Sequence, residues 1–233
     1  MDDQKEKTLA QKKREELFFS PKNGYDRLAA GEEEKIQAYC EGYKTFLDAG
    51  KIERECVDYA IAKAQAAGFR PLVRGEKLQP GDKVYRNNRG KSLLLAVIGR
   101  EGLDQGAVIG AAHIDSPRLD LKQNPLYEDK ELAYCKTHYY GGIKKYQWTT
   151  IPLALHGVVV RRDGSTVAVR IGEDPGDPQF TVGDLLPHLA VDQAKKTMGS
   201  IVSAEQLNLF VGSRPFDQEA GSDRVKLGIL ALL

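Results

Sequence analysis

Two uninterrupted apolar runs, Ser92–Ile98 and Ala107–His113, most constrain what this 233-residue chain can fold into. Runs of this length are typical of strands covered on both faces, and such strands belong to sheets that lie between layers of helices. A shorter strand is predicted at Lys83–Arg86. Because the loops between these segments are short, antiparallel neighbours are possible, so the pattern predicts an α/β fold with a mixed sheet.

Residues 1–31 are rich in charge and predict a solvated helix followed by a loop. Amphipathic spacing then predicts two helices, Ile36–Leu47 and Ile52–Lys63, ahead of the strands. Cys40 and Cys56 fall on the apolar faces of these helices. We therefore expect both to be buried core residues and not nucleophiles.

Beyond Asp120 the sequence changes character, which marks a candidate domain boundary. The dipeptide Asp163-Gly164 predicts the turn of a β-hairpin. The flanking strands of this hairpin are expected at Leu153–Arg161 and Thr166–Ile171.

Two apolar segments follow the hairpin. Leu185–Ala194 predicts another helix or a buried turn. Val225–Leu233 stays apolar to the last residue and lacks the usual signals of a helix end. We therefore expect the chain to be a piece of a longer polypeptide.

Charge and cysteine content narrow the function classes. The 34 basic and 33 acidic residues give a net charge of +1, so no overall field favours nucleic acid or an anionic membrane. No segment approaches the roughly 18 apolar residues of a membrane span, and residues 1–16 have no apolar signal core. The three cysteines lack a CxxC spacing. We expect a cytoplasmic protein without a disulfide framework or a cysteine zinc site.

The segment His113-Ile114-Asp115 ends the second apolar run. In a strand both polar side chains point to the same side, and a carboxylate can orient a metal-binding imidazole. The alternative is a His that ends a strand and an Asp that starts a turn. Arg118 and Asp120 continue the alternation, where they could orient a carboxylate or form an ordinary ion pair.

The other three histidines carry weaker signals. His138 precedes two tyrosines and two glycines that could line a pocket, whereas His156 lies in a strand-like run and is expected to be structural. His188 follows Pro187 at the start of an apolar segment. None has metal-pair spacing, and GxSxG, P-loop and GxGxxG motifs are absent from the sequence.

Three motifs follow one another in the chain, Ala112–Lys122, Thr137–Trp148 and Asp184–Ala190. With these motifs the chain, from about Gly31 onward, resembles the M18 zinc aminopeptidases, most closely their bacterial branch. The resemblance implies a zinc-exopeptidase catalytic domain with a mixed sheet, of which residues 1–122 are the N-terminal part. It also implies that residues 123–233 form an inserted, β-rich dimerisation domain, with dimers that assemble into dodecamers.

The resemblance further implies removal of N-terminal residues from peptides by water activated at two zinc ions, with other divalent ions possible. His113 would be a zinc ligand, and Asp115 would orient its ring or tune the metal. His188 would correspond to the region that reaches a neighbouring subunit's active site. Eukaryotic members have a second His four positions later, where this chain has Asp192.

The family's remaining metal ligands and its catalytic Glu lie after the insertion. Only His113 of the expected ligands is present, and one imidazole cannot hold two ions. We therefore expect this chain to be inactive alone and the activity to belong to the full-length protein. The alternatives are a truncated, non-catalytic paralogue that serves as an assembly or regulatory subunit, and a binding module in which the HxD motif is accidental.

Overall fold

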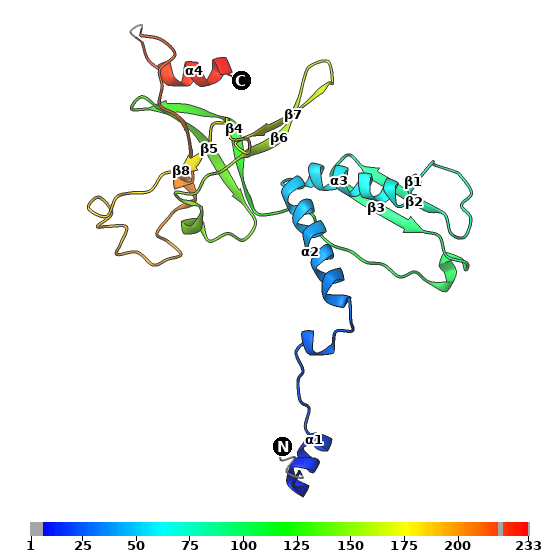
Figure 1. Ribbon diagram of the computed structural model, residues 1–233. Helices are drawn as coiled ribbons and strands as arrows, with labels where there is room; N and C mark the ends of the chain where they lie inside the picture. The colour runs from blue at the N-terminus through cyan, green and yellow to red at the C-terminus, as the bar shows by residue number, and fades with distance from the viewer. Residues whose placement is uncertain (1–6, 219–220, 233) are drawn as a thin grey trace. The chain divides into compact units, whose positions relative to one another are not determined.

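The computed structural model describes residues 7–218 and 221–232 and divides the chain into two units, Met1–Asp48 and Ala49–Leu233 (Figure 1). The predicted boundary at residue 122 remains a prediction. Among the described residues, no helix is long and apolar enough to cross a membrane.

The first unit contains α1 (Leu9–Leu17), the short 3-10 helix η1 (Tyr25–Arg27) and most of α2 (Glu32–Ala49). Helix α2 confirms the predicted amphipathic helix, but its apolar stripe is not buried, and Tyr39 remains 76% exposed. Cys40 is exposed as well, so its expected place in a core is wrong. An apolar stripe becomes core only where another element covers it, and nothing in the described part of this unit covers α2.

In the second unit, α3 (Glu53–Ala66) packs on a sheet of order β1–β2–β3. Its buried face includes Cys56 and Val57, and the facing strand buries Val84 and Tyr85. Gln65 donates a hydrogen bond of 2.9 Å to the Tyr85 hydroxyl. The expectation that Cys56 is a core residue is confirmed.

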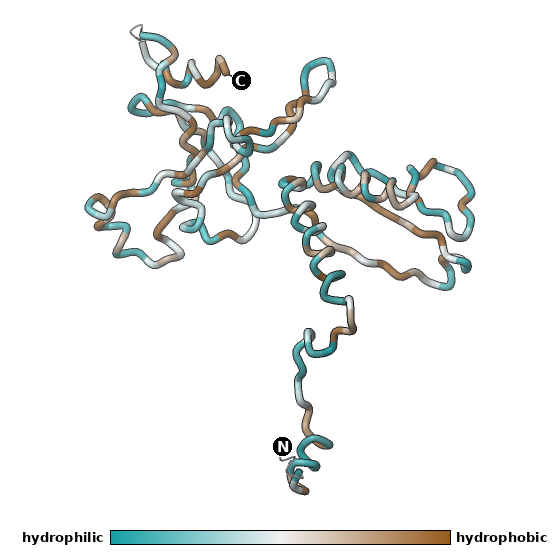
Figure 2. The backbone as a smooth tube through the Cα atoms, in the orientation of Figure 1, coloured by the Kyte–Doolittle hydropathy of each residue, from teal (hydrophilic) through white to brown (hydrophobic). Residues whose placement is uncertain are grey.

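Strands β2 (Lys83–Asn88) and β3 (Ser92–Val97) pair antiparallel and confirm two of the predicted strands, while β1 (Arg70–Pro71) pairs parallel with β2. The prediction that β3 is covered on both faces was wrong, because Leu94 and Val97 are 59% and 61% exposed. Only one face of this sheet meets α3. Figure 2 colours much of β3 and of the chain after it as hydrophobic, and several of these side chains, including Leu95 and Val108, are exposed.

The predicted strand Ala107–His113 was also wrong. This segment follows the 3-10 helix η2 (Leu103–Gln105) and has no regular secondary structure, and Val108 and Ile109 are fully or largely exposed. A strand exists only where its backbone groups find a neighbouring strand, and the described sheets do not pair with this segment. The apolar composition of the run therefore does not determine its conformation.

A four-stranded sheet of order β4–β5–β9–β8 forms the next layer. Strands β4 (Arg118–Asp129) and β5 (Leu132–Tyr140) join through Lys130-Glu131, whose φ angles of 50° and 59° suit a type I′ hairpin turn. Strands β8 (Thr181–Val182) and β9 (Leu209–Gly212) complete the sheet. Its core contains the buried residues Val182, Val202, Leu207 and Leu209. The 3-10 helices η3 (Lys145–Trp148) and η4 (Ala204–Gln206) lie in the connecting segments.

The predicted hairpin is confirmed as β6 (Leu155–Val160) and β7 (Thr166–Ile171). The C-terminal apolar run forms α4 (Arg224–Leu232), which begins where Glu128 of β4 accepts hydrogen bonds from two backbone amides at 2.9 and 2.8 Å. The predicted helix or buried turn at Leu185–Ala194 is wrong, because the segment forms turns and Leu185, Leu186 and Leu189 are more than half exposed.

Candidate active site and metal-binding segment

His113-Ile114-Asp115 lies in the irregular segment that leads into β4 and not at the end of a strand. Its backbone contacts α3 through Cys56, whose Sγ lies 3.7 Å from the carbonyl oxygen of Ile114. The same Sγ lies 3.5 Å from the carbonyl oxygen of Gly50. Burial raises the pKa of the Cys56 thiol, so the group remains a neutral donor. The core of the second unit thus holds the polar segment in place.

The His113 imidazole is fixed on one side and open on the other. Its Nδ1 lies 3.0 Å from the carbonyl oxygen of Asp115 and 3.3 Å from Asp115 Oδ1, while the side chain is 84% exposed. The carbonyl accepts only, so Nδ1 carries the proton, and in the neutral ring Nε2 then presents a lone pair. This is how metal-binding imidazoles are commonly oriented.

Asp115 is held by a tyrosine from the neighbouring hairpin. The Tyr140 hydroxyl of β5 donates a hydrogen bond to Asp115 Oδ2, and the Arg118 guanidinium lies 4.1 Å from the centre of the Tyr140 ring. Arg118 Nε in turn donates to Asp120 at 2.7 Å. The hydrogen bond from Tyr140 lowers the pKa of Asp115, helped by the nearby His113, and the same bond raises the pKa of Tyr140. Asp115 is therefore an ionised acceptor beside the His113 ring.

These residues do not complete a metal site. Within residues 7–218 and 221–232, no group of three or more His, Cys, Asp or Glu side chains could hold a metal ion. Two zinc ions need several ligands each, and this segment presents one imidazole with one carboxylate that already accepts a hydrogen bond from Tyr140. The described residues fit part of a zinc centre and not a whole one.

His188, the candidate for a cross-subunit contact, lies exposed in the turns after β8. No hydrogen bond or ion pair joins it to His113 or Asp115 in the described part of the chain. His138 is exposed on β5 and stacks against Tyr139 with ring centres 5.8 Å apart. Neither histidine is brought to the HxD segment.

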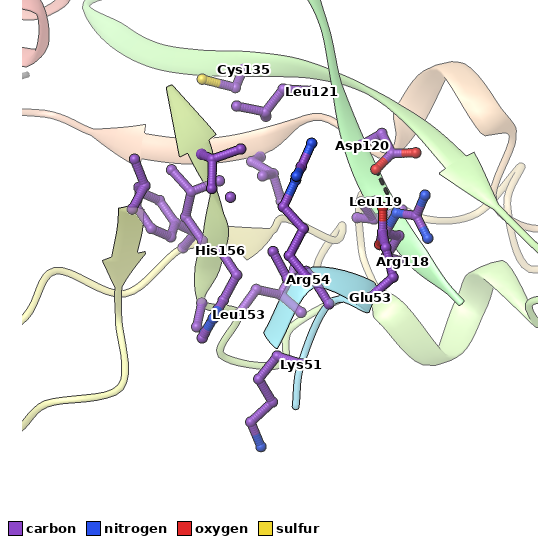
Figure 3. A pocket seen from close by; sticks show the side chains of 18 of the residues that line it. Lys51, Glu53, Arg54, Arg118, Leu119, Asp120, Leu121, Cys135, Leu153 and His156 are labelled. Atoms are coloured by element: carbon purple, nitrogen blue, oxygen red, sulfur yellow. Dashed lines mark hydrogen bonds and ion pairs between the residues drawn. The ribbon is translucent and has the colours of Figure 1, made fainter. Parts of the chain in front are cut away.

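A cavity of about 630 Å³ begins beside this network (Figure 3). Arg118 and Asp120 line one wall, and the apolar side chains of Leu119, Leu121 and Leu153 form much of its interior. Figure 3 shows these side chains grouped around Arg54 of α3. The cavity thus lies between the start of α3, strand β4 and the β6–β7 hairpin.

Two contacts were not predicted from the sequence. The bond from Tyr140 to Asp115 joins residues 25 positions apart, although the His-Tyr-Tyr-Gly-Gly motif did indicate aromatic side chains near a close backbone approach. Gly141 lies beside Pro117, next to the HxD segment, with a φ of 81° that favours glycine. The second contact joins Glu55 to His156 over 101 positions and has no local sequence signal.

Comparison with known proteins supports one family. The family described as "Aminopeptidase I zinc metalloprotease (M18)" matches residues 46–233. A probable M18 family aminopeptidase 1 from Clostridium acetobutylicum is 49% identical over 222 residues, which cover 94% of this chain and 48% of the relative. The chain thus spans about half the length of the curated relatives it matches.

Solved structures give the same result. The crystal structure of the M18 aminopeptidase from Thermotoga maritima matches with a TM-score of 0.83 and 38% identity, covering 92% of this chain and 46% of that protein. The mApe1 dodecamer of S. cerevisiae matches with a TM-score of 0.58 and 15% identity over 81% of this chain and 40% of that one, and shows the fold alone. The α/β mixed-sheet fold expected from the sequence is confirmed.

Proposed function

The chain belongs to the M18 family of zinc aminopeptidases, and we propose that the full-length protein containing it removes N-terminal residues from peptides in a zinc-dependent reaction. The observation that supports this proposal is the His113 ring, whose Nδ1 lies against Asp115 while its exposed side chain leaves Nε2 open to bind a metal ion. We propose His113 as one zinc ligand and Asp115 as the group that orients it.

Zinc in such enzymes activates a water molecule and polarises the carbonyl that is attacked. We propose two zinc ions, with the remaining ligands and the general base supplied by residues outside this chain. The role of the present residues is to hold one imidazole in a defined tautomer. The 233-residue chain is therefore expected to be inactive alone.

We propose that residues 123–233 form the inserted dimerisation domain and that the protein assembles into homo-oligomers. Membership of the M18 family supports this proposal. His188 is proposed to approach a neighbouring subunit's active site, which its exposure permits. A cytoplasmic location is proposed because Cys40, Cys56 and Cys135 are all free thiols.

An assay of the full-length gene product against Asp-, Leu- and Lys-aminopeptidase substrates tests the function. We expect hydrolysis of at least one substrate, loss with a chelator and recovery with zinc. The His113→Ala variant should lose activity, whereas His138→Ala, which changes an exposed histidine on β5, should keep it.

A second candidate is an assembly or regulatory subunit without catalysis. It is favoured by the incomplete metal-ligand set among the described residues. A stop codon directly after Leu233 in the gene, together with no activity and binding to an active aminopeptidase, would establish this candidate over the enzyme. An in-frame continuation with acidic and histidine motifs would exclude it.

A further inference from the structure

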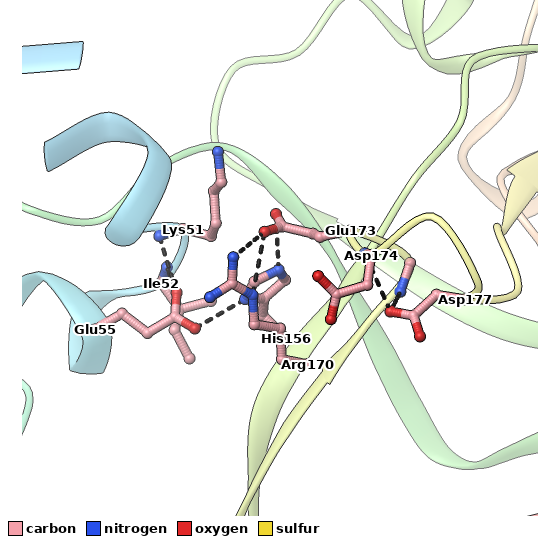
Figure 4. Close-up of polar contacts among 9 residues, drawn as sticks. Lys51, Ile52, Glu55, His156, Arg170, Glu173, Asp174 and Asp177 are labelled. Atoms are coloured by element: carbon pink, nitrogen blue, oxygen red, sulfur yellow. Dashed lines mark hydrogen bonds and ion pairs between the residues drawn. The ribbon is translucent and has the colours of Figure 1, made fainter. Parts of the chain in front are cut away.

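His156 of β6 is buried between two carboxylates (Figure 4). Its side chain is 7% exposed, with Nδ1 2.8 Å from Glu55 Oε1 and Nε2 3.1 Å from Glu173 Oε1. Glu55 belongs to α3, whereas Glu173 follows β7. The ring therefore joins a helix and a hairpin that are 101 residues apart in the sequence.

Counting donors gives the protonation state that this geometry requires. An ionised carboxylate only accepts hydrogen bonds, and a neutral imidazole donates from one nitrogen and accepts at the other. Two ionised carboxylates on both nitrogens of His156 can be satisfied only if both nitrogens carry protons. With a neutral ring, one lone pair would face a carboxylate in a site with little water.

Each carboxylate also accepts hydrogen bonds at Oε2, the oxygen that does not contact the ring. Glu55 Oε2 accepts the backbone amides of Lys51 and Ile52 at 2.9 and 3.2 Å, which caps α3. Glu173 Oε2 accepts two hydrogen bonds from Arg170, at 3.2 and 2.5 Å. Neither carboxylate can turn away from the ring without losing these bonds.

The charges around Glu173 favour its ionised form. Burial opposes the ionisation of Glu173, but the hydrogen bond and charge of Arg170 and the charge of His156 outweigh it and lower the pKa of Glu173. Other charged groups in this region are Lys51 before α3 and Asp174 and Asp177 after β7 (Figure 4). Asp177 accepts the Gly172 amide at 2.8 Å and so closes the loop that carries Glu173.

We propose that doubly protonated His156, through its bonds to Glu55 and Glu173, holds the β6–β7 hairpin against the N-terminus of α3, and that this link depends on the second ring proton. We call this link the tie. The ring, Ile52 and Leu155 all line the 630 Å³ cavity, so the tie also fixes one wall of that cavity. Loss of the second ring proton removes one of the two bonds and leaves a lone pair against a carboxylate. The hairpin then separates from α3 more often, and the cavity opens.

The Glu173 side of the tie has a pH limit. Because the pKa of Glu173 is lowered in the folded protein, its contribution to stability is present above the ordinary value and is lost as pH falls through the lowered one.

The experiment combines ring NMR with amide hydrogen exchange on the 233-residue chain between pH 5 and 8.5. Two-bond ¹H–¹⁵N spectra of ¹⁵N-histidine report the protonation of His156, assigned with the His156→Gln variant. Exchange of hairpin amides, corrected for the intrinsic pH dependence, reports opening. We expect both ring nitrogens to be protonated while the hairpin is protected, and loss of the second proton to coincide with faster hairpin exchange.

Glu173→Gln provides the matched variant, because it keeps size and removes one charge. The affinity of the ring for its second proton should fall about tenfold or more, since an adjacent opposite charge shifts such equilibria by that amount. Glu76→Gln is the control. Glu76 is 21% exposed and forms an ion pair with Arg70, much as Glu173 is 22% exposed and forms an ion pair with Arg170. Glu76, however, makes no contact with His156 within the residues that the structure describes. Glu76→Gln should leave both readouts unchanged.

A His156 ring that holds one proton while the hairpin is fully protected would overturn the proposal. So would hairpin exchange that is independent of the ring's protonation, or equal effects of Glu173→Gln and Glu76→Gln. These outcomes do not depend on peptidase activity, so the tie can fail while the proposed function stands, and the reverse also holds.

Discussion

His113 and His156 have the same side chain in opposite settings. The His113 side chain is 84% exposed, with one nitrogen fixed by Asp115, whereas the His156 side chain is 7% exposed, with a carboxylate on each nitrogen. An imidazole with a free nitrogen can bind something new. One with both nitrogens occupied joins parts of the fold. Partner geometry, and not residue type, therefore separates the candidate ligand from the structural tie.

The largest expected effect is on zinc binding by the full-length protein. Asp115→Asn removes the carboxylate 3.3 Å from His113 Nδ1, while the backbone carbonyl at 3.0 Å remains, and should lower zinc affinity about tenfold, the lower end of what loss of an orienting partner costs at zinc sites. Competition with a chromogenic chelator measures this. His156→Gln should leave zinc affinity unchanged, and an equal loss in both variants would erase the contrast between the two histidines.

The free energy of unfolding should depend on His156 and hardly on His113. His156→Ala leaves two carboxylates facing each other and should cost about 2–3 kcal/mol, less than a fully buried pair because Glu55 and Glu173 keep 27% and 22% exposure. His113→Ala should change the free energy of unfolding by no more than about 0.5 kcal/mol, as surface substitutions usually do. Urea unfolding monitored by circular dichroism gives both values. Equal losses of unfolding free energy in the two variants would contradict the assignment of His156 as the structural histidine.

The cysteines offer a parallel contrast, since Cys40 is exposed and Cys56 is buried with a raised pKa. Alkylation requires the thiolate and access to it, so Cys40 should react with iodoacetamide about tenfold or more faster than Cys56. Mass spectrometry of tryptic peptides at pH 7.5 measures both rates. Comparable rates would show that Cys56, on the packed face of α3, is not buried in solution.

A smaller effect is expected on the acid side. As pH falls through the lowered pKa of Glu173, its carboxylate becomes neutral and the tie weakens. Hairpin amides of β6 and β7 should lose protection below about pH 4, the ordinary range for Glu, in hydrogen exchange. Glu173→Gln should remove this acid step, and an unchanged step would assign it to other carboxylates.

The sequence predicted elements whose signals are local. The amphipathic spacing of Ile52–Lys63 and the Asp163-Gly164 turn predicted α3 and the β6–β7 hairpin, because a helix face and a tight turn depend on neighbouring residues. The apolar run Ala107–His113 was misassigned, since a strand also needs a partner strand, which can lie anywhere in a protein. The Leu185–Ala194 segment was misassigned because its apolar side chains become core only where another element covers them, and Leu185, Leu186 and Leu189 are more than half exposed.

The same distinction between local and long-range signals applies to the candidate site. His113 and Asp115 were identified because they are two residues apart and belong to a recognisable motif. His156 was expected to be structural, but its contact with Glu55 and the contact of Tyr140 with Asp115 were not predicted, because they span 101 and 25 residues. Long-range polar contacts leave no periodic trace in a sequence, whereas the residue types that make them are common.

The measurement that tests the central claim most directly is the zinc content of two purified proteins, the 233-residue chain and the full-length gene product, after dialysis against metal-free buffer. The chain is expected to retain less than one zinc ion, because within its described residues no group of three or more His, Cys, Asp or Glu side chains could hold a metal ion. The full-length protein should retain two, and the His113→Ala variant fewer. Two tightly held zinc ions on the 233-residue chain itself would contradict the account.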